Sequence, residues 1–325
     1  MSQIKKIGVF TSGGDSPGMN AAIRAVVRTG LYYNLEVVGI MRGYAGMITG
    51  DIVPMDRKSV ANIIQRGGTI LKTARSDEFR TKEGRRQAYD QLKAHGIDAL
   101  VAIGGDGTFT GANIFVSEFD IPVMGLPGTI DNDLVGTDFT IGYDTAINTV
   151  IDAVDKIRDT AESHDRLFIV EVMGRDSGLI ALRSGIGAGA EAILIPESKT
   201  DVRALIDRLE KGRKDKASKI IIVAEGDDAG GAFQIATIMK ERFPHYDTRV
   251  SILGHMQRGG RPTCMDRVLS SRLGVAAVES LMEGRSGEMI GIIHGEIHYT
   301  SFANAIKHLE EVNPNFLKIV DILSL

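Results

Sequence analysis

The chain has 325 residues, a length that corresponds to roughly two domains. Hydrophobic residues make up 43% and charged residues 25%, which excludes a disordered or fibrous protein. The formal net charge of −4 provides no global basic field to attract nucleic acid or an anionic membrane. Aromatic residues are only 6%, with no tryptophan, which argues against stacking on single-stranded nucleic acid.

Glycine is unusually frequent, with 38 residues, because an ordinary chain contains about 7%. This surplus predicts tight turns and loops where the backbone approaches a ligand closely. The single cysteine, Cys264, excludes an intrachain disulfide and a cysteine-based metal cluster. No apolar stretch approaches the ~20 residues of a membrane span, and the first one is too short for a signal peptide, so we expect a cytoplasmic protein.

Short apolar runs alternate with helical patterns along the chain. The predicted strands are residues 7–11, 36–40, 99–103, 123–126, 167–172, 192–195, 220–224, 250–253 and 289–293; the predicted helices are 19–32, 84–95, 141–160, 202–214 and 267–283. Strands rich in Val, Ile and Leu are typical of parallel sheets covered by helices on both faces. We therefore expect an α/β fold of two Rossmann-like, doubly wound domains, closely associated and with chain crossovers.

Glycine-and-aspartate turns follow three of these strands, with the sequences TSGGDSPG at 11–18, IGGDGT at 103–108 and VMGRDSG at 172–178. Ligands of open parallel sheets bind outside the carboxyl ends of the strands, near the helix N-termini. A single such turn is explained as well by glycine simply ending a strand. Three together indicate one ligand crevice.

The GGDGT turn, residues 104–108, has the chemistry of a phosphate loop. Its glycines let backbone N–H groups reach phosphate oxygens, and the helix that follows adds positive partial charge. Because Asp106 would repel phosphates unless a cation lay between, we predict that it binds Mg²⁺ directly or through water. The turn with Gly13, Gly14 and Asp15, which also precedes a predicted helix, is expected to form a second wall of the phosphate site. Neither of these two turns matches a P-loop, and neither contains a complete Gly-x-Gly-x-x-Gly.

The segment PGTIDND, residues 127–133, carries a stronger signal. It follows strand 123–126 directly and is expected at the same sheet edge as Asp106. If the segment is extended, Asp131 and Asp133 face the same way, so that one accepts a substrate hydroxyl proton and the other orders a metal or the base. Asx turns at a strand end are the structural alternative.

Several basic residues lie beside strand ends or glycine turns, where guanidinium and imidazole groups suit phosphate oxygens, although a residue of this kind alone is more often a solvated charge. They are Arg75, Arg166, Arg175, Arg249, His255 and Arg258.

With these motifs in order, the chain resembles the bacterial ATP-dependent 6-phosphofructokinases over essentially its full length. The resemblance rests on residues 11–20, 104–108, 127–133, 170–175 and 253–260. It implies transfer of the γ-phosphoryl group of MgATP to the 1-hydroxyl of fructose 6-phosphate in glycolysis. Phosphoryl transfer of this kind depends on positioning and charge neutralisation more than on covalent chemistry.

The resemblance assigns roles residue by residue. Asp131 would be the general base with Thr129 beside it, and Arg175 would hold the phosphoryl group. The implied ATP site is Gly14, Arg75, Ser76, Gly105, Asp106, Gly107 and Thr108, with Asp106 ordering Mg²⁺. The implied fructose 6-phosphate site is Thr129, Ile130, Asp131, Arg166, Met173, Gly174, Arg175, Glu225, Arg249, His255, Met256, Gln257 and Arg258.

The resemblance also implies a regulated homotetramer, because in this family Arg166 and Arg249 reach a neighbouring subunit's site. The resemblance implies an effector site where ADP binds to activate the enzyme and phosphoenolpyruvate binds to inhibit it. Its residues would be Arg24, Arg28, Arg57, Arg158, Gly189, Glu191, Lys214 and Lys216. Here the chain departs from the family, whose basic stretch often ends Lys-Lys-His, since residues 214–219 read KDKASK. Lys72 and Ser76 replace a small residue and an aromatic, so ATP affinity is expected to be atypical.

The expected domains are a nucleotide-binding domain, residues 1–140 with a return at about 255–305, and a sugar-phosphate-binding domain, residues 141–254 with segment 306–325 packed on it. The nearest alternative is a pyrophosphate-dependent homologue, which typically has aspartate at 107 and lysine at 128, where this chain has glycine. A NAD-kinase-like or lipid-kinase-like enzyme would lack 127–133 and the His255 block. A two-lobed sugar-binding protein would need a secretion signal.

Overall fold

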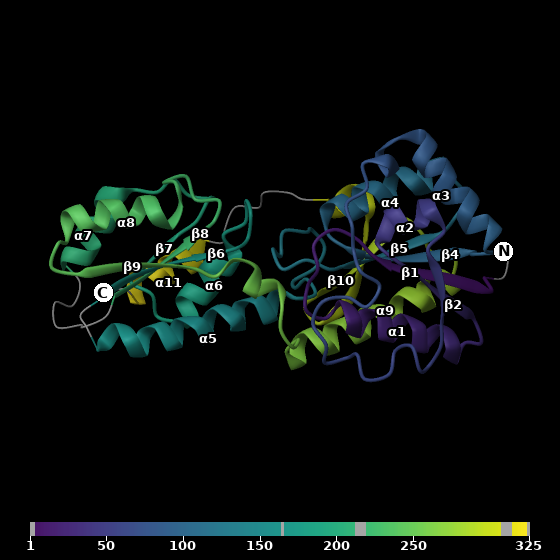
Figure 1. Ribbon diagram of the computed structural model, residues 1–325, viewed down its shortest axis with the longest axis horizontal. Helices are drawn as coiled ribbons and strands as arrows, with labels where there is room; N and C mark the ends of the chain where they lie inside the picture. Colours follow the sequence, from purple (N-terminus) through teal and green to yellow (C-terminus); the bar gives the residue numbers. More distant parts are fainter. Residues whose placement is uncertain (1–3, 164–165, 212–218, 307–313, 324–325) are drawn as a thin grey trace. The chain divides into compact units, whose positions relative to one another are not determined.

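The structure is a computed structural model that describes residues 4–163, 166–211, 219–306 and 314–323 (Figure 1). It divides into two compact units between which the chain crosses repeatedly. The first unit comprises Met1–Ile130, Leu134–Thr145 and Arg258–His308, and the second comprises Asp131–Asp133, Ala146–Gln257 and Leu309–Leu325. Each unit has a mainly parallel sheet with helices on both faces, so the predicted fold class is confirmed.

The first unit contains a seven-stranded sheet in the order β11-β10-β5-β4-β1-β2-β3. Its strands are β1 (Lys6–Thr11), β2 (Glu36–Ile40), β3 (Ile52–Met55), β4 (Ala99–Gly104), β5 (Val123–Pro127), β10 (Glu288–Ile293) and β11 (Glu296–Ser301). The five inner strands pair in parallel, and only β3 and β11, at the two edges, pair antiparallel.

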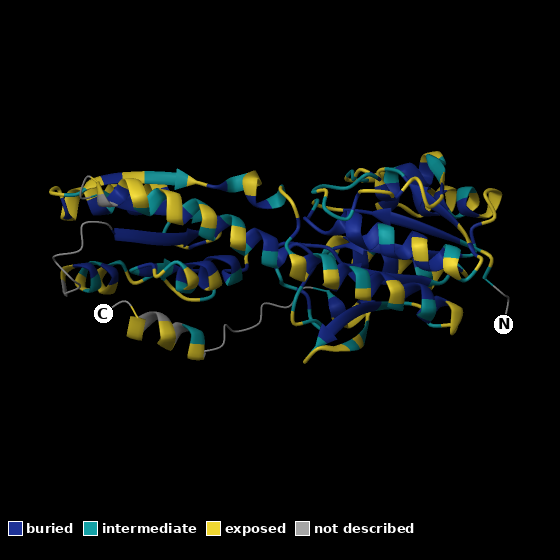
Figure 2. Ribbon diagram, turned by 90° about the horizontal axis from the view of Figure 1, so that it is seen from below, coloured by how far each residue is buried: buried dark blue, intermediate teal, exposed yellow. Residues whose placement is uncertain are grey.

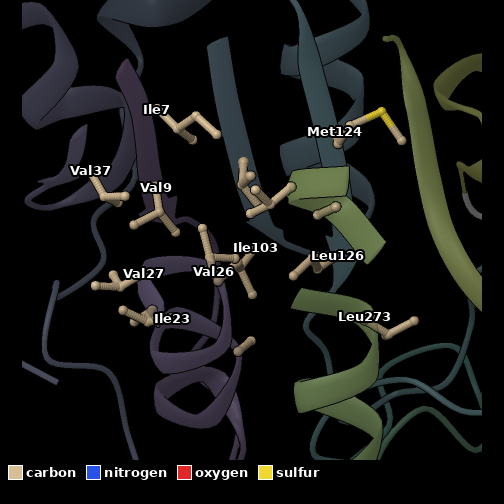
Figure 3. Packing of buried hydrophobic residues seen from close by; sticks show 14 of the residues in the cluster. Ile7, Val9, Ile23, Val26, Val27, Val37, Ile103, Met124, Leu126 and Leu273 are labelled. Carbon is tan, nitrogen blue, oxygen red and sulfur yellow. The ribbon is translucent and has the colours of Figure 1, made fainter. Parts of the chain in front are cut away.

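Helices α1 (Met19–Tyr32) and α9 (Cys264–Met282) lie side by side on one face of this sheet, where their apolar side chains meet those of the strands. Figure 3 shows Ile23 and Val26 of α1 and Leu273 of α9 beneath Val9 and Leu126 of the strands. The other face carries α2 (Gly43–Thr49), α3 (Lys82–Ala94), α4 (Asp106–Glu118) and α10 (Phe302–Ala305), with the short 3₁₀ helix Glu78–Arg80.

The second unit contains a four-stranded, fully parallel sheet in the order β7-β8-β6-β9. Its strands are β6 (Arg166–Val172), β7 (Ala192–Leu194), β8 (Lys219–Ala224) and β9 (Asp247–Ile252). Its helices are α6 (Leu179–Gly187), α7 (Val202–Lys211), α8 (Gly231–Arg242), α11 (Pro314–Leu323) and most of α5 (Tyr143–Glu162). The central strands are buried, whereas the outer helix faces are exposed (Figure 2).

All nine predicted strands are present: 36–40 matches β2 at both ends, and no other predicted end is more than three residues from the observed one. The two strands that sequence reasoning missed are the antiparallel edges of the first sheet: β3 contains Pro54, and β11 follows a turn at His294 and Gly295, both with positive φ. Helix α7 is described to Lys211, and the rest of the predicted helix 202–214 lies outside the described residues. None of the described helices is long and apolar enough to span a membrane.

Asp266 joins the N-termini of α5 and α9. Its side chain is 1% exposed and accepts hydrogen bonds from the backbone N–H groups of Gly142 and Thr145, both at 2.8 Å, and from the Thr145 hydroxyl at 2.5 Å. Burial raises the pKa of Asp266 to about 6, against the effect of these donors, so the carboxylate is ionised at neutral pH. Asp266 therefore fixes the point where α5 leaves the first unit.

We expect Asp266→Ala to lower the free energy of unfolding at pH 7 by about 3 kcal/mol or more, because it leaves two buried N–H groups without acceptors. Urea unfolding followed by circular dichroism measures the change. Replacing Asp152, an exposed aspartate paired with Lys156 on α5, is the matched control and should cost less than about 1 kcal/mol. Equal losses in the two variants would contradict the role of Asp266.

Candidate functional site

The first candidate site lies at the carboxyl ends of β1 and β4. From β1 the chain proceeds to β2 on one side and, later, to β4 on the other, so these two neighbours flank a topological switch point, where ligands of such sheets bind. The two turns contact each other directly, because the Ser12 N–H donates to the Ile103 carbonyl at 3.0 Å. The two predicted phosphate turns are thus side by side in the first unit.

Close backbone approach explains the glycines of these turns. A Cβ at Gly104 would lie 2.6 Å from the Ser12 carbonyl oxygen, and Gly13 has a φ of 82°. Thr108 is buried, and its hydroxyl lies 3.7 Å from the position that a Cβ on Gly13 would take. Gly107 is exposed, and a Cβ on it would have no atom within 4 Å, so the space in front of it is open.

Asp106 is the first residue of α4 and is half-buried. Among the residues that the structure describes, no group of three or more His, Cys, Asp or Glu side chains could hold a metal ion by itself. Mg²⁺ usually binds through one or two carboxylates together with substrate phosphates and water, so a single aspartate in a phosphate turn fits this ion. The donor set fits Mg²⁺ that arrives with a nucleotide.

A loop that carries Arg75 is fastened to the first turn. The Thr11 hydroxyl donates to the Lys72 carbonyl at 2.8 Å, and the Thr73 hydroxyl donates to the Gly13 carbonyl at 2.7 Å. Asn20, 1% exposed, donates to the Gly67 carbonyl and accepts from the Ile70 N–H. These bonds place the exposed Arg75 beside the phosphate turns.

Lys72 and Ser76, the two departures in this loop, have distinct local roles. Lys72 adopts a left-handed backbone conformation, with a φ of 57°. The Ser76 hydroxyl accepts a hydrogen bond from the Phe79 N–H at 3.3 Å and so supports the 3₁₀ helix that follows.

The segment 127–133 begins in the first unit and ends in the second. Gly128 donates its N–H to the Gly104 carbonyl at 2.9 Å, and the Thr129 carbonyl accepts from the Thr140 hydroxyl at 2.6 Å, which fixes the start of the segment beside the phosphate turns. Ile130 is fully buried, and Asp131 is 4% exposed. Within the second unit, the Asp131 carbonyl accepts from the Ser177 hydroxyl at 3.0 Å.

The expectation of an extended segment is wrong. Asn132 has a φ of 53°, so the chain turns between Asp131 and Asp133, and the condition under which both carboxylates face the same way is not met. Asp131 is buried and Asp133 is half-exposed, so the two carboxyl groups have different environments. The alternation rule failed because a left-handed residue interrupts it.

A second set of predicted residues gathers at the carboxyl ends of β6, β8 and β9. Gly174 and Arg175 both have positive φ, at 147° and 56°. The Glu225 carboxylate accepts from the Arg175 N–H at 2.7 Å and the Gly174 N–H at 3.3 Å. The buried Gln257 accepts from the Met173 N–H at 2.9 Å. Glu225 and Gln257 therefore hold the turn that presents the exposed Arg175 side chain.

The block 254–258 is shared by the two units. Gln257 lies in the second unit, whereas Arg258 belongs to the first, where its Nη1 atom donates to the Asp15 carbonyl at 3.3 Å and lies against Gly14. His255 and Met256 are exposed. The structure thus places Arg258 at the first phosphate turn and Gln257 at the Met173 turn.

Arg166 lies at the opposite end of the four-stranded sheet, and Arg249 lies midway along β9. Arg166 is the first residue of β6 and Arg249 the third of β9, and both contact Asp247, the first residue of β9. Because a strand rises about 3.3 Å per residue, the backbone of Arg166 is about 20 Å from the end of β6, where Arg175 and Glu225 follow. Within one subunit, Arg166 is therefore far from Arg175 and Glu225. Asp247 was missed from the sequence.

The predicted effector residues fall into two groups. In the first unit, Arg24 and Arg28 lie one turn apart on α1, and partial burial together with the charge of Arg28 lowers the pKa of Arg24; Arg57 lies in the exposed loop after β3. In the second unit, Arg158 donates to the carbonyls of Ala188 and Gly189, and Glu191 accepts from the Ile220 N–H at 2.6 Å. Lys214 and Lys216 lie outside the described residues.

The chain was compared with known proteins. The family model described as "Phosphofructokinase" matches residues 6–281. The chain is 58% identical over 322 residues to the ATP-dependent 6-phosphofructokinase of Cytophaga hutchinsonii, covering 99% of this chain and 98% of that protein. It is 55% identical over 323 residues to ATP-dependent 6-phosphofructokinase 1 of Thermus thermophilus, covering 99% and 100%.

The chain is similar to a solved structure of phosphofructokinase from Saccharomyces cerevisiae, with a TM-score of 0.86 and 39% sequence identity between the two chains. The match covers 98% of this chain and 48% of that chain, so the present chain spans about half of the yeast polypeptide.

Proposed function

Because the chain belongs to the phosphofructokinase family, we propose that it transfers the γ-phosphoryl group of ATP to the 1-hydroxyl of fructose 6-phosphate, giving fructose 1,6-bisphosphate and ADP. The observation that carries this proposal is the pair of glycine turns at the switch point, where Gly107 leaves open space for a nucleotide. Relatives 55–58% identical over nearly the whole chain are named ATP-dependent 6-phosphofructokinases, which supports ATP rather than pyrophosphate as the donor.

The proposed mechanism assigns roles to residues that the family resemblance implies. The Asp131 carboxylate accepts the proton of the 1-hydroxyl while that oxygen bonds to the γ-phosphorus and the bond to the ADP oxygen breaks. Thr129 adjoins Asp131, and Arg75 and Arg175 neutralise charge on the phosphoryl oxygens. Gly14, Gly105 and Thr108 form the nucleotide loop, and Glu225 accepts from a sugar hydroxyl.

Asp106 would hold Mg²⁺ together with the phosphates of ATP. When bound, the ion supplies neutralisation of phosphate charge. Asp106 is suited to this role because it stands at the first position of α4, between the phosphate turns and the helix.

We further propose that the protein is a homotetramer in which Arg166 and Arg249 serve the sugar-phosphate site of a neighbouring subunit. The position of Arg166 at the opposite end of β6 from Arg175 and Glu225, and the contact of both arginines with Asp247, support this arrangement. A subunit that uses both pairs for one substrate needs the first pair from another copy.

Changing Arg249 to Ala should raise the KM for fructose 6-phosphate by about tenfold or more, because a charge-assisted hydrogen bond to phosphate is lost. The KM for ATP should change less than twofold. Steady-state kinetics with each substrate varied in turn measures both constants. A fully active monomer, detected by light scattering at the assay concentration, would exclude the shared site.

The residues Arg24, Arg28, Arg57, Arg158, Gly189 and Glu191 support a proposed effector site for ADP and phosphoenolpyruvate. The two arginines of α1 concentrate positive charge on one helix face, which suits a phosphate. We expect Arg24→Ala to remove the response to both effectors and leave the rate without effectors within about twofold of wild type. If the wild-type enzyme responds to neither compound, the Ala217 and Ser218 departures mark a site that has lost its function.

We propose that the first unit binds the nucleotide and the second the sugar phosphate, and that the enzyme works in the cytoplasm without a nucleic-acid or membrane partner. The small net charge and the glycolytic substrates support this setting.

A coupled assay tests the proposed function. Fructose 6-phosphate is supplied with ATP or with pyrophosphate, each with and without Mg²⁺, and formation of the bisphosphate is followed through aldolase. We expect turnover with ATP and Mg²⁺ only. Faster turnover with pyrophosphate would overturn the donor, and no turnover with either would overturn the reaction.

A further inference from the structure

Two arginines of the second unit share one carboxylate oxygen. The Asp247 Oδ2 atom accepts from Arg166 Nε at 3.1 Å and from Arg249 Nε and Nη2 at 3.0 and 2.8 Å. Strand pairing sets this arrangement, because Arg166 is opposite Asp247 across the β6–β9 ladder and Arg249 lies two residues further along the same face of β9.

The bonds to Asp247 leave one NH₂ group on each guanidinium available. Arg166 uses Nε for Asp247 and Nη1 for the Thr160 hydroxyl at 3.3 Å, so its Nη2 has no hydrogen bond within the described chain. Arg249 uses Nε and Nη2, and its Nη1 is likewise without a partner in the part of the chain that the structure describes. The two groups are therefore oriented and still able to donate.

The charges of Arg166, Arg249 and Asp247 favour their mutual contact at neutral pH. Two guanidinium groups around one carboxylate keep a net positive charge, which still attracts a phosphate. The hydrogen bonds from Arg249 and Arg166 lower the pKa of Asp247, so its carboxylate stays ionised at neutral pH. The side chains are only partly buried, 22% exposed for Arg166 and 56% for Arg249, so without a partner both would sample many rotamers.

We propose that Asp247 is a positioning residue that presents Arg166 and Arg249 as one preformed pair to the sugar phosphate. This inference rests on the proposed function. Preorganisation raises affinity because fewer rotamers are lost when the ligand binds. Repulsion between Asp247 and the phosphate opposes this gain, but solvent screens it at these exposed positions.

The test compares the variants Asp247→Ala and Asp247→Asn with wild type in steady-state kinetics. We expect Asp247→Ala to raise the KM for fructose 6-phosphate about tenfold, with kcat and the KM for ATP within twofold. Asp247→Asn keeps an acceptor oxygen without the charge and should raise that KM less. It also carries the test if the alanine variant does not fold. The control is Asp152→Ala, which removes an exposed aspartate from an ion pair on α5 in the same unit and should leave every constant unchanged.

A double-mutant cycle separates positioning from a general structural effect. When Arg249 is already alanine, Asp247→Ala should raise the KM less than threefold, because one of the two side chains that it orients is gone. An unchanged or lowered KM in the single variants, or full additivity in the cycle, would overturn the inference. A wild-type enzyme that does not phosphorylate fructose 6-phosphate would instead overturn the proposed function.

Discussion

Asp131→Asn is expected to lower kcat by about 10²–10⁴ while leaving the fold and the binding of both substrates intact. The asparagine has almost the same shape, but its amide cannot take the proton of the sugar hydroxyl. Asp131 is 4% exposed and its backbone carbonyl is bonded to the Ser177 hydroxyl, so the variant keeps the local backbone anchor. The coupled assay at saturating ATP and fructose 6-phosphate measures kcat.

Asp133→Asn is the matched comparison for this variant. Asp133 lies two residues away in the same motif, beyond the left-handed Asn132, and is more exposed than Asp131. We expect it to lose less than tenfold in kcat. If the kcat of Asp131→Asn is within threefold of the wild-type kcat, Asp131 is not the general base. If Asp133→Asn loses more kcat than Asp131→Asn, Asp133 is the base instead. Thermal unfolding of both variants checks that neither has lost the fold.

Gly107→Asp is expected to lower kcat/KM for ATP by roughly tenfold to a thousandfold, because its carboxylate would face the α-phosphate with a repulsion of about 1–4 kcal/mol. No atom lies within 4 Å of a Cβ at Gly107, so the new side chain enters open space without a clash. An acidic residue in the first turn of α4 also suits the helix dipole, so stability should not fall. Kinetics with ATP varied at saturating fructose 6-phosphate measures the loss.

Gly107→Asn is the control that separates charge from size. Its side chain has nearly the volume of aspartate, so a loss that depends on charge should be much smaller in this variant. Equal losses in both would assign the effect to blocked space rather than to repulsion, and unchanged ATP kinetics in both would contradict a nucleotide site at this turn. Gly128 is a poorer test, because a Cβ there would lie 3.0 Å from Met19 and 3.1 Å from Ile103.

The buried parallel strands were predictable from sequence because a strand buried on both faces is a continuous apolar run. Such a run is visible in the sequence even when the neighbouring strands are not known. The edge strands β3 and β11 lack this pattern because most of their residues are not buried, and β3 also contains Pro54. Turn chemistry predicted where the two glycine turns lie, because glycine and aspartate mark close backbone approach within a few residues; that the turns bind phosphate stays a prediction.

The contacts that support the site could not be predicted in the same way. Asp247 acts on Arg166 from 81 residues away, and Gln257 on Met173 from 84 residues away, through strand pairing that no local pattern specifies. Asn20 did leave a signal, as a polar residue on the apolar face of a helix, and the structure explains it by its bonds to Gly67 and Ile70. Asn132 has a left-handed backbone, which is one of several conformations that asparagine tolerates. The residue type alone therefore did not predict the turn between Asp131 and Asp133.

The packing of α1 on α9 sets an order of events during synthesis. Ile23 and Val26 of α1 bury their side chains against a layer that includes Leu273, which the ribosome adds 241 residues after Tyr32, the last residue of α1. At about 5–20 residues per second, the first strands and α1 wait roughly 10–50 s for their partner. Meanwhile the apolar face of α1 is open to water, to chaperones and to other nascent chains. The first unit therefore completes its fold only after most of the second, up to Gln257, has been synthesised. We expect the yield of soluble protein to depend on what protects α1 during this interval.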